Sequence, residues 1–148
     1  MWRVFEYLSS IEVGGETDFA EAFRRPASIR RGAAFVVSDF LAPGGYQDGL
    51  RALAAVNAQV SLLHVVTPEE VEPTHVGDLA LVDRETGALV DVTATARVRR
   101  IYQDTFDAHC AGISSFAHKY GMTYSLASTE RPLEELIFTS LRVSGVVG

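Results

Sequence analysis

Two nearly continuous apolar runs stand out in the pattern of hydrophobic and polar positions along the chain. They cover residues 33–38 and 60–66, and the second is interrupted by Ser61 and His64. Strands buried on both faces of a parallel sheet have runs of this kind and length. Between them, residues 46–57 carry apolar side chains at helical spacing, which predicts a helix. This order of strand, helix and strand is typical of a parallel sheet with covering helices.

Helical spacing predicts four more helices. A short one opens the chain, and a second begins at Thr17 and Asp18, both good helix N-caps, and runs to about Arg25. The longest covers residues 96–120 and ends at Gly121, a residue type that favours helix C-termini. One continuous buried stripe is predicted on this helix, formed by Val98, Ile101, Tyr102, Thr105, Phe106, His109, Ile113, Phe116, Ala117 and Tyr120. The predicted buried positions of the last helix are Leu133, Leu136, Ile137 and Leu141.

The pattern changes after the second strand. Residues 78–83 and 88–92 are short β-rich runs, and turn residues 84–87 separate them, which predicts a β-hairpin. A third short strand is predicted at residues 123–127. The sequence therefore predicts an α/β fold with a three-stranded parallel sheet, a β-hairpin and flanking helices. Three strands are few for a sheet of this kind.

Composition and charge narrow the range of functions. The chain has 148 residues, enough for one domain with a core, and a formal net charge of −6 without a basic patch, which argues against nucleic acid as a partner. Its single cysteine, Cys110, excludes an intrachain disulfide and fits a reducing compartment, so we expect a cytoplasmic location. No segment reaches the roughly 18 consecutive apolar residues of a membrane span, and none is expected in this chain.

Asp39 is the main candidate for chemistry because it directly follows the first strand. Ligands of open α/β sheets bind outside the carboxyl ends of the strands. Asp39 is therefore either a metal ligand or a residue that caps the turn before Pro43 and Gly44. Glu69 and Glu70 follow the second strand at the same edge, where paired acids suit acid–base or metal chemistry. The first turn of a helix is the simpler explanation for both.

The other polar candidates have structural explanations. Residues 91–95 imitate an Asp-x-Ser-x-Ser pattern, but they follow the hairpin and precede the longest helix. We expect the four histidines not to cluster, with His64 and His109 in the core and His75 and His118 exposed. The lone cysteine has no base beside it in sequence and is interpreted as inert. Zinc-ligand spacings, a Walker A loop and a Gly-x-Ser-x-Gly motif do not occur in the sequence.

A series of short motifs runs along the chain in a specific order. They are Gly15-Glu16-Thr17-Asp18-Phe19, Val36-Val37-Ser38-Asp39-Phe40-Leu41, His64-Val65-Val66-Thr67-Pro68-Glu69-Glu70 and Leu81-Val82-Asp83-Arg84-Glu85-Thr86-Gly87, followed by Tyr102 and Pro132-Leu133-Glu134. In this order the series resembles the C-terminal part of the domain of unknown function 58 family, which is von Willebrand factor A-like. The resemblance covers nearly the whole chain. It implies a truncated, Rossmann-type von Willebrand A-like sheet in a single domain over residues 1–148, incomplete at its N-terminus.

The resemblance also implies a metal-ion-dependent adhesion site, which three loops form at the carboxyl edge of such sheets. Its threonine matches Thr17, its aspartate matches Asp39, and the metal is Mg²⁺. The Asp-x-Ser-x-Ser loop of the family should precede Thr17, yet residues 1–16 contain no aspartate. Because Mg²⁺ needs near-octahedral oxygen coordination, Thr17 and Asp39 alone would bind it weakly or not at all.

The favoured function is a non-catalytic protein-interaction or assembly module, with a MoxR-type AAA ATPase as partner by family analogy. Two alternatives stay open: a metal-dependent hydrolase that uses Asp39 with Glu69 or Glu70, and an inactive remnant or fragment. In a truncated sheet the strand at residues 33–38 would lack a neighbour on one side. An unpaired apolar edge favours association, so a homodimer is predicted.

Overall fold

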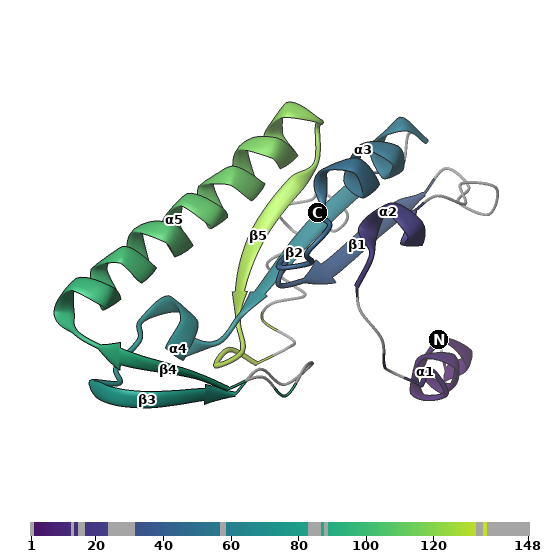
Figure 1. Cartoon of the computed structure of the whole chain (residues 1–148). Coiled ribbons are helices and arrows are strands. Elements are labelled where there is room, and N and C mark those ends of the chain that lie inside the picture. The colour runs from purple at the N-terminus through teal and green to yellow at the C-terminus, as the bar shows by residue number, and fades with distance from the viewer. Residues whose placement is uncertain are drawn as a thin grey trace.

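The main sheet contains three parallel strands. A computed structural model describes residues 2–12, 14, 17–23, 32–56, 59–82, 87, 89–132 and 135 of the chain. Strands β1 (Ala33–Ser38), β2 (Gln59–Val66) and β5 (Thr123–Ser128) lie in the order β1-β2-β5, so β2 is central (Figure 1). All three predicted strands are confirmed, as is the α/β fold class.

Five helices accompany the strands within the described residues. They are α1 (Trp2–Ser9), α2 (Phe19–Ala22), α3 (Gln47–Ala55), α4 (Pro68–Val71) and α5 (Ala96–Lys119). Helix α2 begins as predicted, because the Asp18 carboxylate accepts a hydrogen bond from the Glu21 N–H at 2.9 Å. Arg25 and the buried positions predicted for the last helix lie outside the described residues. None of the helices in the described part of the chain has the length and apolar character that a membrane span requires.

The hydrophobic core lies between one face of the sheet and helices α3 and α5. Val36 of β1 and Leu62 of β2 are partners in the parallel register, and both point into this core. Helix α3 contributes Leu50 and helix α5 contributes Ile113, and both side chains are fully buried. Burial of these side chains holds both helices against the sheet.

Strand β1 combines an open edge with an exposed apolar face. Within the described residues it pairs only with β2. Phe35 and Val37 alternate with the core residue Val36, and they are 48% and 62% exposed on the opposite face.

Strands β3 (Gly77–Val82) and β4 (Leu89–Ala94) form the predicted hairpin, a separate antiparallel pair. The hairpin lies beside the start of α5, at the carboxyl end of the parallel strands (Figure 1). Residues 83–86, which include most of the predicted turn, lie outside the described residues. Four apolar side chains of the hairpin strands are between 52% and 69% exposed, namely Leu81, Val82, Leu89 and Val90.

The continuous buried stripe predicted for the longest helix is wrong in its N-terminal half. Ile113 and Ala117 are fully buried, but Ile101 and Tyr102 are 55% and 39% exposed. The 24 residues of α5 give a helix about 36 Å long, whereas the eight residues of β2 span only about 26 Å. The helix therefore extends past the sheet, and its N-terminal half lies next to α4 and β4 (Figure 1).

Candidate functional site

Asp39 lies at the carboxyl end of β1, where it stabilises a turn. Its Oδ1 accepts a hydrogen bond from the Leu41 N–H at 3.0 Å, and Ser38 Oγ accepts one from the Phe40 N–H at 3.0 Å. Such local bonds between side chain and backbone define Asx- and Ser-type turns. The turn-capping interpretation of Asp39 is confirmed, and its metal-binding role stays a prediction.

Phe40 fixes the backbone that presents Asp39. It has a φ of 58°, a left-handed conformation that a bulky side chain rarely adopts, and it is 2% exposed. Its ring stacks on Phe19 at a centroid distance of 5.7 Å and meets His64 edge-on at 5.5 Å. These contacts hold a conformation that costs on the order of 1–3 kcal/mol.

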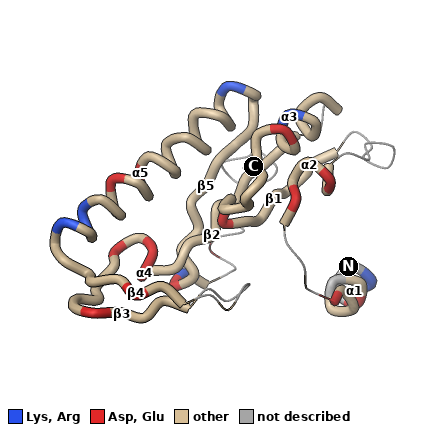
Figure 2. The backbone as a smooth tube through the Cα atoms, in the orientation of Figure 1, with Lys and Arg blue, Asp and Glu red and all other residues tan. Residues whose placement is uncertain are grey.

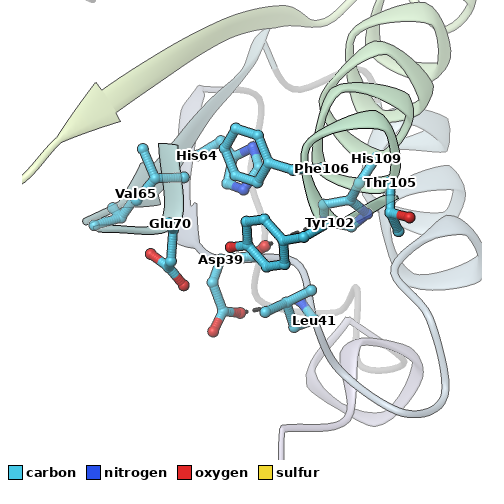
Figure 3. A pocket seen from close by; sticks show the side chains of 10 residues that line it. Asp39, Leu41, His64, Val65, Glu70, Tyr102, Thr105, Phe106 and His109 are labelled. Carbon is cyan, nitrogen blue, oxygen red and sulfur yellow. Dashed lines mark hydrogen bonds between the residues drawn. The ribbon is translucent and has the colours of Figure 1, made fainter. Parts of the chain in front are cut away.

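A cavity of about 230 Å³ opens beside Asp39. It lies between the carboxyl ends of β1 and β2, helix α4 and the N-terminal half of α5 (Figure 3). The carboxylates of Asp39 and Glu70 lie at the same end of it, and the remaining walls are mainly aromatic and aliphatic (Figure 3). The lining residues are Asp39, Leu41, His64, Val65, Val66, Glu70, Tyr102, Thr105, Phe106 and His109.

Two of the four histidines meet at this cavity, so the expectation that they do not cluster is wrong. The rings of His64 and His109 are 5.5 Å apart, edge to face. They belong to β2 and α5, which are distant in sequence, and only the packing of the helix on the sheet brings them together. His75 and His118 are exposed, as predicted.

His64 is a core histidine with hydrogen-bond partners, as predicted. It is 2% exposed, and its Nδ1 lies 2.9 Å from the hydroxyl oxygen of Tyr124. The backbone carbonyl oxygen of Asp39 lies 3.4 Å from Nε2 of the neighbouring His109. Burial lowers the pKa of His64, and the charge of His109 lowers it further, whereas Asp39 and Glu70 oppose the shift. The neutral ring is therefore a fixed part of the cavity wall at pH 7.

Cys110 lies nearer to a base than its place in the sequence indicates. Its Sγ is 4.0 Å from Nδ1 of His64. Burial nevertheless raises the pKa of the thiol, which keeps it protonated at neutral pH. This agrees with the interpretation of Cys110 as an inert cysteine.

Glu69 and Glu70 stand in the first turn of α4, but they face different surroundings. Glu70 forms a capping box with Thr67: its Oε2 accepts the Thr67 N–H at 2.6 Å, and Thr67 Oγ1 accepts the Glu70 N–H at 3.3 Å. The helix-terminus explanation is thus confirmed. Glu70 also lines the cavity, whereas Glu69 lines a separate groove with Arg131. Of the two acids considered together with Asp39, only Glu70 shares its cavity.

Thr17, the other predicted metal ligand, is exposed and does not line this cavity. Its segment lies near that of Asp39, because Phe19 and Phe40 stack on each other. In the described part of the chain, no three histidine, cysteine or acidic residues are grouped closely enough to hold a metal ion. Thr17 and Asp39 by themselves do not fit a complete Mg²⁺ site, since most of an octahedral shell would be left to water.

The segment of residues 91–95 has the structural role that its position predicts. Thr93 Oγ1 donates a hydrogen bond to Asp78 Oδ1 at 2.7 Å, across the hairpin. Thr95 is the N-cap of α5, and its Oγ1 accepts the Val98 N–H at 3.2 Å.

Sequence reasoning missed the aromatic wall of the cavity. Tyr102 and Phe106 stack on successive turns of α5, with centroids 6.3 Å apart and planes 13° apart. Their spacing of four residues identifies a common helix face, but it does not distinguish a buried face from one that lines a cavity. Burial raises the pKa of Tyr102, and the charge of the nearby Glu70 raises it further.

Comparison with known proteins identifies the family. A family model described as "Protein of unknown function DUF58" matches residues 9–112. The chain belongs to the DUF58 family. The matched region contains Asp39, Glu70, Tyr102 and Phe106, so this cavity lies within the DUF58 part of the chain.

Relatives of this DUF58 chain occur in mycobacteria. It is 35% identical over 122 residues to uncharacterized protein MAV169 of Mycobacterium avium, and the aligned region covers 80% of this chain and 71% of that protein. It is 31% identical over 134 residues to uncharacterized protein Mb1516 of Mycobacterium bovis, and the aligned region covers 88% of this chain but only 42% of that protein. The DUF58 chain thus spans less than half the length of the second relative. A solved structure of conserved hypothetical protein BatB from Bacteroides thetaiotaomicron aligns at 18% identity with a TM-score of 0.44, covering 95% of this chain and 66% of BatB.

Proposed function

We propose that this DUF58 chain is a protein-interaction and assembly module without catalytic activity of its own. The exposed apolar surface of the hairpin carries the proposal. Leu81 pairs with Val90 and Val82 with Leu89 across the strands, so apolar side chains occupy both faces. A two-stranded hairpin is barely stable by itself, and a group of large exposed apolar side chains is characteristic of interaction sites. The hairpin is therefore the surface on which a partner docks.

The partner in this proposal is a MoxR-type AAA ATPase, and the parallel sheet is von Willebrand A-like. Both come from the family resemblance. The parallel order β1-β2-β5, with a cavity at the carboxyl edge, supports an α/β sheet that places a binding site where sheets of that type have it. The proposal places the protein in the cytoplasm, where a single unpaired cysteine is ordinary.

The adhesion-type Mg²⁺ site on Thr17 and Asp39 is weak or lost in this proposal. Asp39 Oδ1 accepts the Leu41 N–H, and Thr17 lies outside the cavity that Asp39 lines. Calorimetric titration with Mg²⁺ tests this point. A dissociation constant for Mg²⁺ below about 1 mM, the upper end of the range of weak protein sites for divalent cations, would contradict the loss or weakness of this site.

A metal-dependent hydrolase is the second candidate, because Asp39 and Glu70 share one cavity. Its general base is hard to assign. The Glu70 carboxylate already accepts the Thr67 N–H at 2.6 Å, and His64 is buried with its Nδ1 2.9 Å from the Tyr124 hydroxyl oxygen. These contacts favour the interaction function over the hydrolase.

The hairpin provides the test of the interaction function. Replacing Leu81 and Val90 together by aspartate should weaken binding to the MoxR-type ATPase of the same genome at least tenfold, because central apolar contacts dominate interface energies. Calorimetry with the two purified proteins measures the affinity. The matched control replaces two exposed apolar residues of another region, Tyr7 and Ile11, by aspartate, and should bind normally. Equal affinity of the hairpin variant would refute the docking surface, and a remnant without activity would bind no ATPase at all.

A further inference from the structure

We propose that the cavity beside Asp39 binds a basic side chain, preferably arginine, that a partner protein inserts. The inference rests on the proposed interaction function and deepens it by naming the chemistry of the partner. Four features of the cavity carry it: its charge, the form of its walls, its size and its position beside the exposed apolar surface.

The charge of the cavity favours a cation. Among the residues that the structure describes, its lining includes Asp39 and Glu70 but no lysine or arginine. The ion pairs found among the described residues join Asp48 to Arg51 and Arg131 to Glu135, so they leave this cavity unneutralised. Figure 2 shows the acidic positions of α4 at this edge of the sheet. A cation that enters gains charge-assisted hydrogen bonds to carboxylates that have no lysine or arginine partner among the described residues.

The walls suit a planar cation in particular. The rings of Tyr102 and Phe106 both line the cavity, and their planes are within 13° of parallel. Figure 3 shows the two carboxylates and the Tyr102 ring around the same space. A guanidinium group stacks on aromatic faces and donates two parallel hydrogen bonds to a carboxylate, whereas an ammonium does neither as well. This pairing of a flat aromatic face with carboxylates distinguishes arginine from lysine.

The size of the cavity indicates a side chain. Sites for small molecules and cofactors usually have about 300–1,000 Å³. This cavity has about 230 Å³, enough for the end of one long side chain.

The position of the cavity indicates a protein as the source of that side chain. Its aromatic wall belongs to the N-terminal half of α5, where Val98 and Ile101 are 38% and 55% exposed. This part of α5 lies against β4 of the hairpin. A polypeptide docked on the hairpin can therefore continue along α5 and place an arginine in the cavity.

Two blocked peptides test the inference in a buffer with EDTA. The probe is acetyl-Gly-Ser-Arg-Ser-Gly-amide, and the reference carries citrulline, a neutral analogue of almost the same shape, in place of arginine. NMR titration of the whole chain should show saturable binding of the arginine peptide and at least tenfold weaker binding of the citrulline peptide, because the charge-assisted hydrogen bonds are lost.

Isosteric variants locate the site. Glu70→Gln keeps an oxygen for the Thr67 N–H, and Asp39→Asn keeps one for the Leu41 N–H, so both retain their local structure. Each should weaken the arginine peptide about tenfold. The matched control is Glu69→Gln, which removes the same charge from the same helical turn but outside the cavity, and should leave the affinity within a factor of two.

Several outcomes would overturn the inference. They are equal binding of the two peptides, no saturable binding of the arginine peptide, and equal losses in Glu69→Gln and Glu70→Gln. Free L-arginine that binds tenfold tighter than the blocked peptide would make the ligand an amino acid instead of a partner's side chain.

The same measurements separate the cavity assignment from the proposed function. If the arginine peptide does not bind while the ATPase still binds through the hairpin, the cavity assignment is wrong and the proposed function stands. If the peptide binds in the cavity and the ATPase does not bind, the cavity assignment stands and the ATPase is the wrong partner.

Discussion

Asp39 and Glu70 each have a local structural role and a place in the cavity. The Asp39 carboxylate accepts the Leu41 N–H, and that of Glu70 accepts the Thr67 N–H. Both bonds span three residues or fewer, so turn and capping rules predict them from sequence. Their shared cavity depends on β1, β2 and α5, which no local rule joins. A substitution that removes the accepting oxygen of either residue therefore changes the local fold and the cavity together. Asp39→Asn and Glu70→Gln keep that oxygen and change only the charge.

His64 should make stability depend on pH. Because burial lowers its pKa from the ordinary 6.5, the unfolded chain binds this proton more readily than the folded one. The His64 contribution to the free energy of unfolding is thus complete above about pH 7 and decreases as the pH falls below about 6.5, the ordinary pKa of histidine. Urea denaturation across this range measures the slope. His64→Gln should flatten it, and His118→Gln, an exposed control, should not. An unchanged slope in His64→Gln would assign the effect to another group.

The helices show how far periodicity predicts packing. The 3.6-residue pattern of α5 correctly identifies a helix and its apolar face, but the sheet is too short to cover that face. The uncovered half became the wall of the cavity. At the other side of the core, α3 approaches the start of α2 so closely that only glycine fits at position 49. A methyl group there would overlap the Phe19 carbonyl and lie 2.8 Å from the Cβ atom of Phe19.

Two glycine substitutions should act in opposite directions. Gly49→Ala should destabilise the fold by about 1–2 kcal/mol, since the overlap with Phe19 outweighs the helix propensity of alanine. Gly112→Ala in α5 should stabilise it by up to about 1 kcal/mol, because the nearest atom, Tyr46 Oη, is 3.8 Å from the added methyl group. Thermal or urea unfolding measures both. Equal effects would mean that α2 yields to the added methyl group.

At the scale of the whole molecule, the edge of β1 that faces away from β2 has no partner strand among the described residues. Phe35 and Val37 are exposed on one face of this strand, and β2 is its only partner within the described residues. Unpaired strand edges with apolar side chains readily pair with another chain. We propose that the purified chain forms a homodimer through β1.

Val37→Lys should weaken this dimer at least tenfold, because a lysine on an edge strand disfavours pairing with a second copy. Sedimentation velocity at several concentrations measures the dissociation constant. Val76→Lys is the matched control, since Val76 is 68% exposed in the segment before β3 and away from the edge of β1. A wild-type chain that is monomeric at every concentration would exclude the dimer.

Sequence by itself determined the elements of this protein. Apolar runs, helical spacing and turn residues predicted β1, β2, β5, the hairpin and the helices α1, α2, α3 and α5, whereas the one-turn helix α4 was not among the helices that spacing predicted. These predictions succeed because they depend on side chains that are near each other in the chain, where period and capping chemistry act directly. The positions of Asp39 and Glu70 at one edge of the sheet followed from the same reasoning, because the carboxyl ends of parallel strands share an edge.

Only the tertiary structure decided how these elements meet. It brought His109 to His64, separated Glu69 from Glu70, left Thr17 outside the cavity and turned half of a predicted core stripe into an aromatic wall. Each result depends on relative lengths and packing angles of elements that are distant in sequence. Hydrophobic burial rewards any apolar contact, so a sequence pattern identifies which face is apolar but not what covers it.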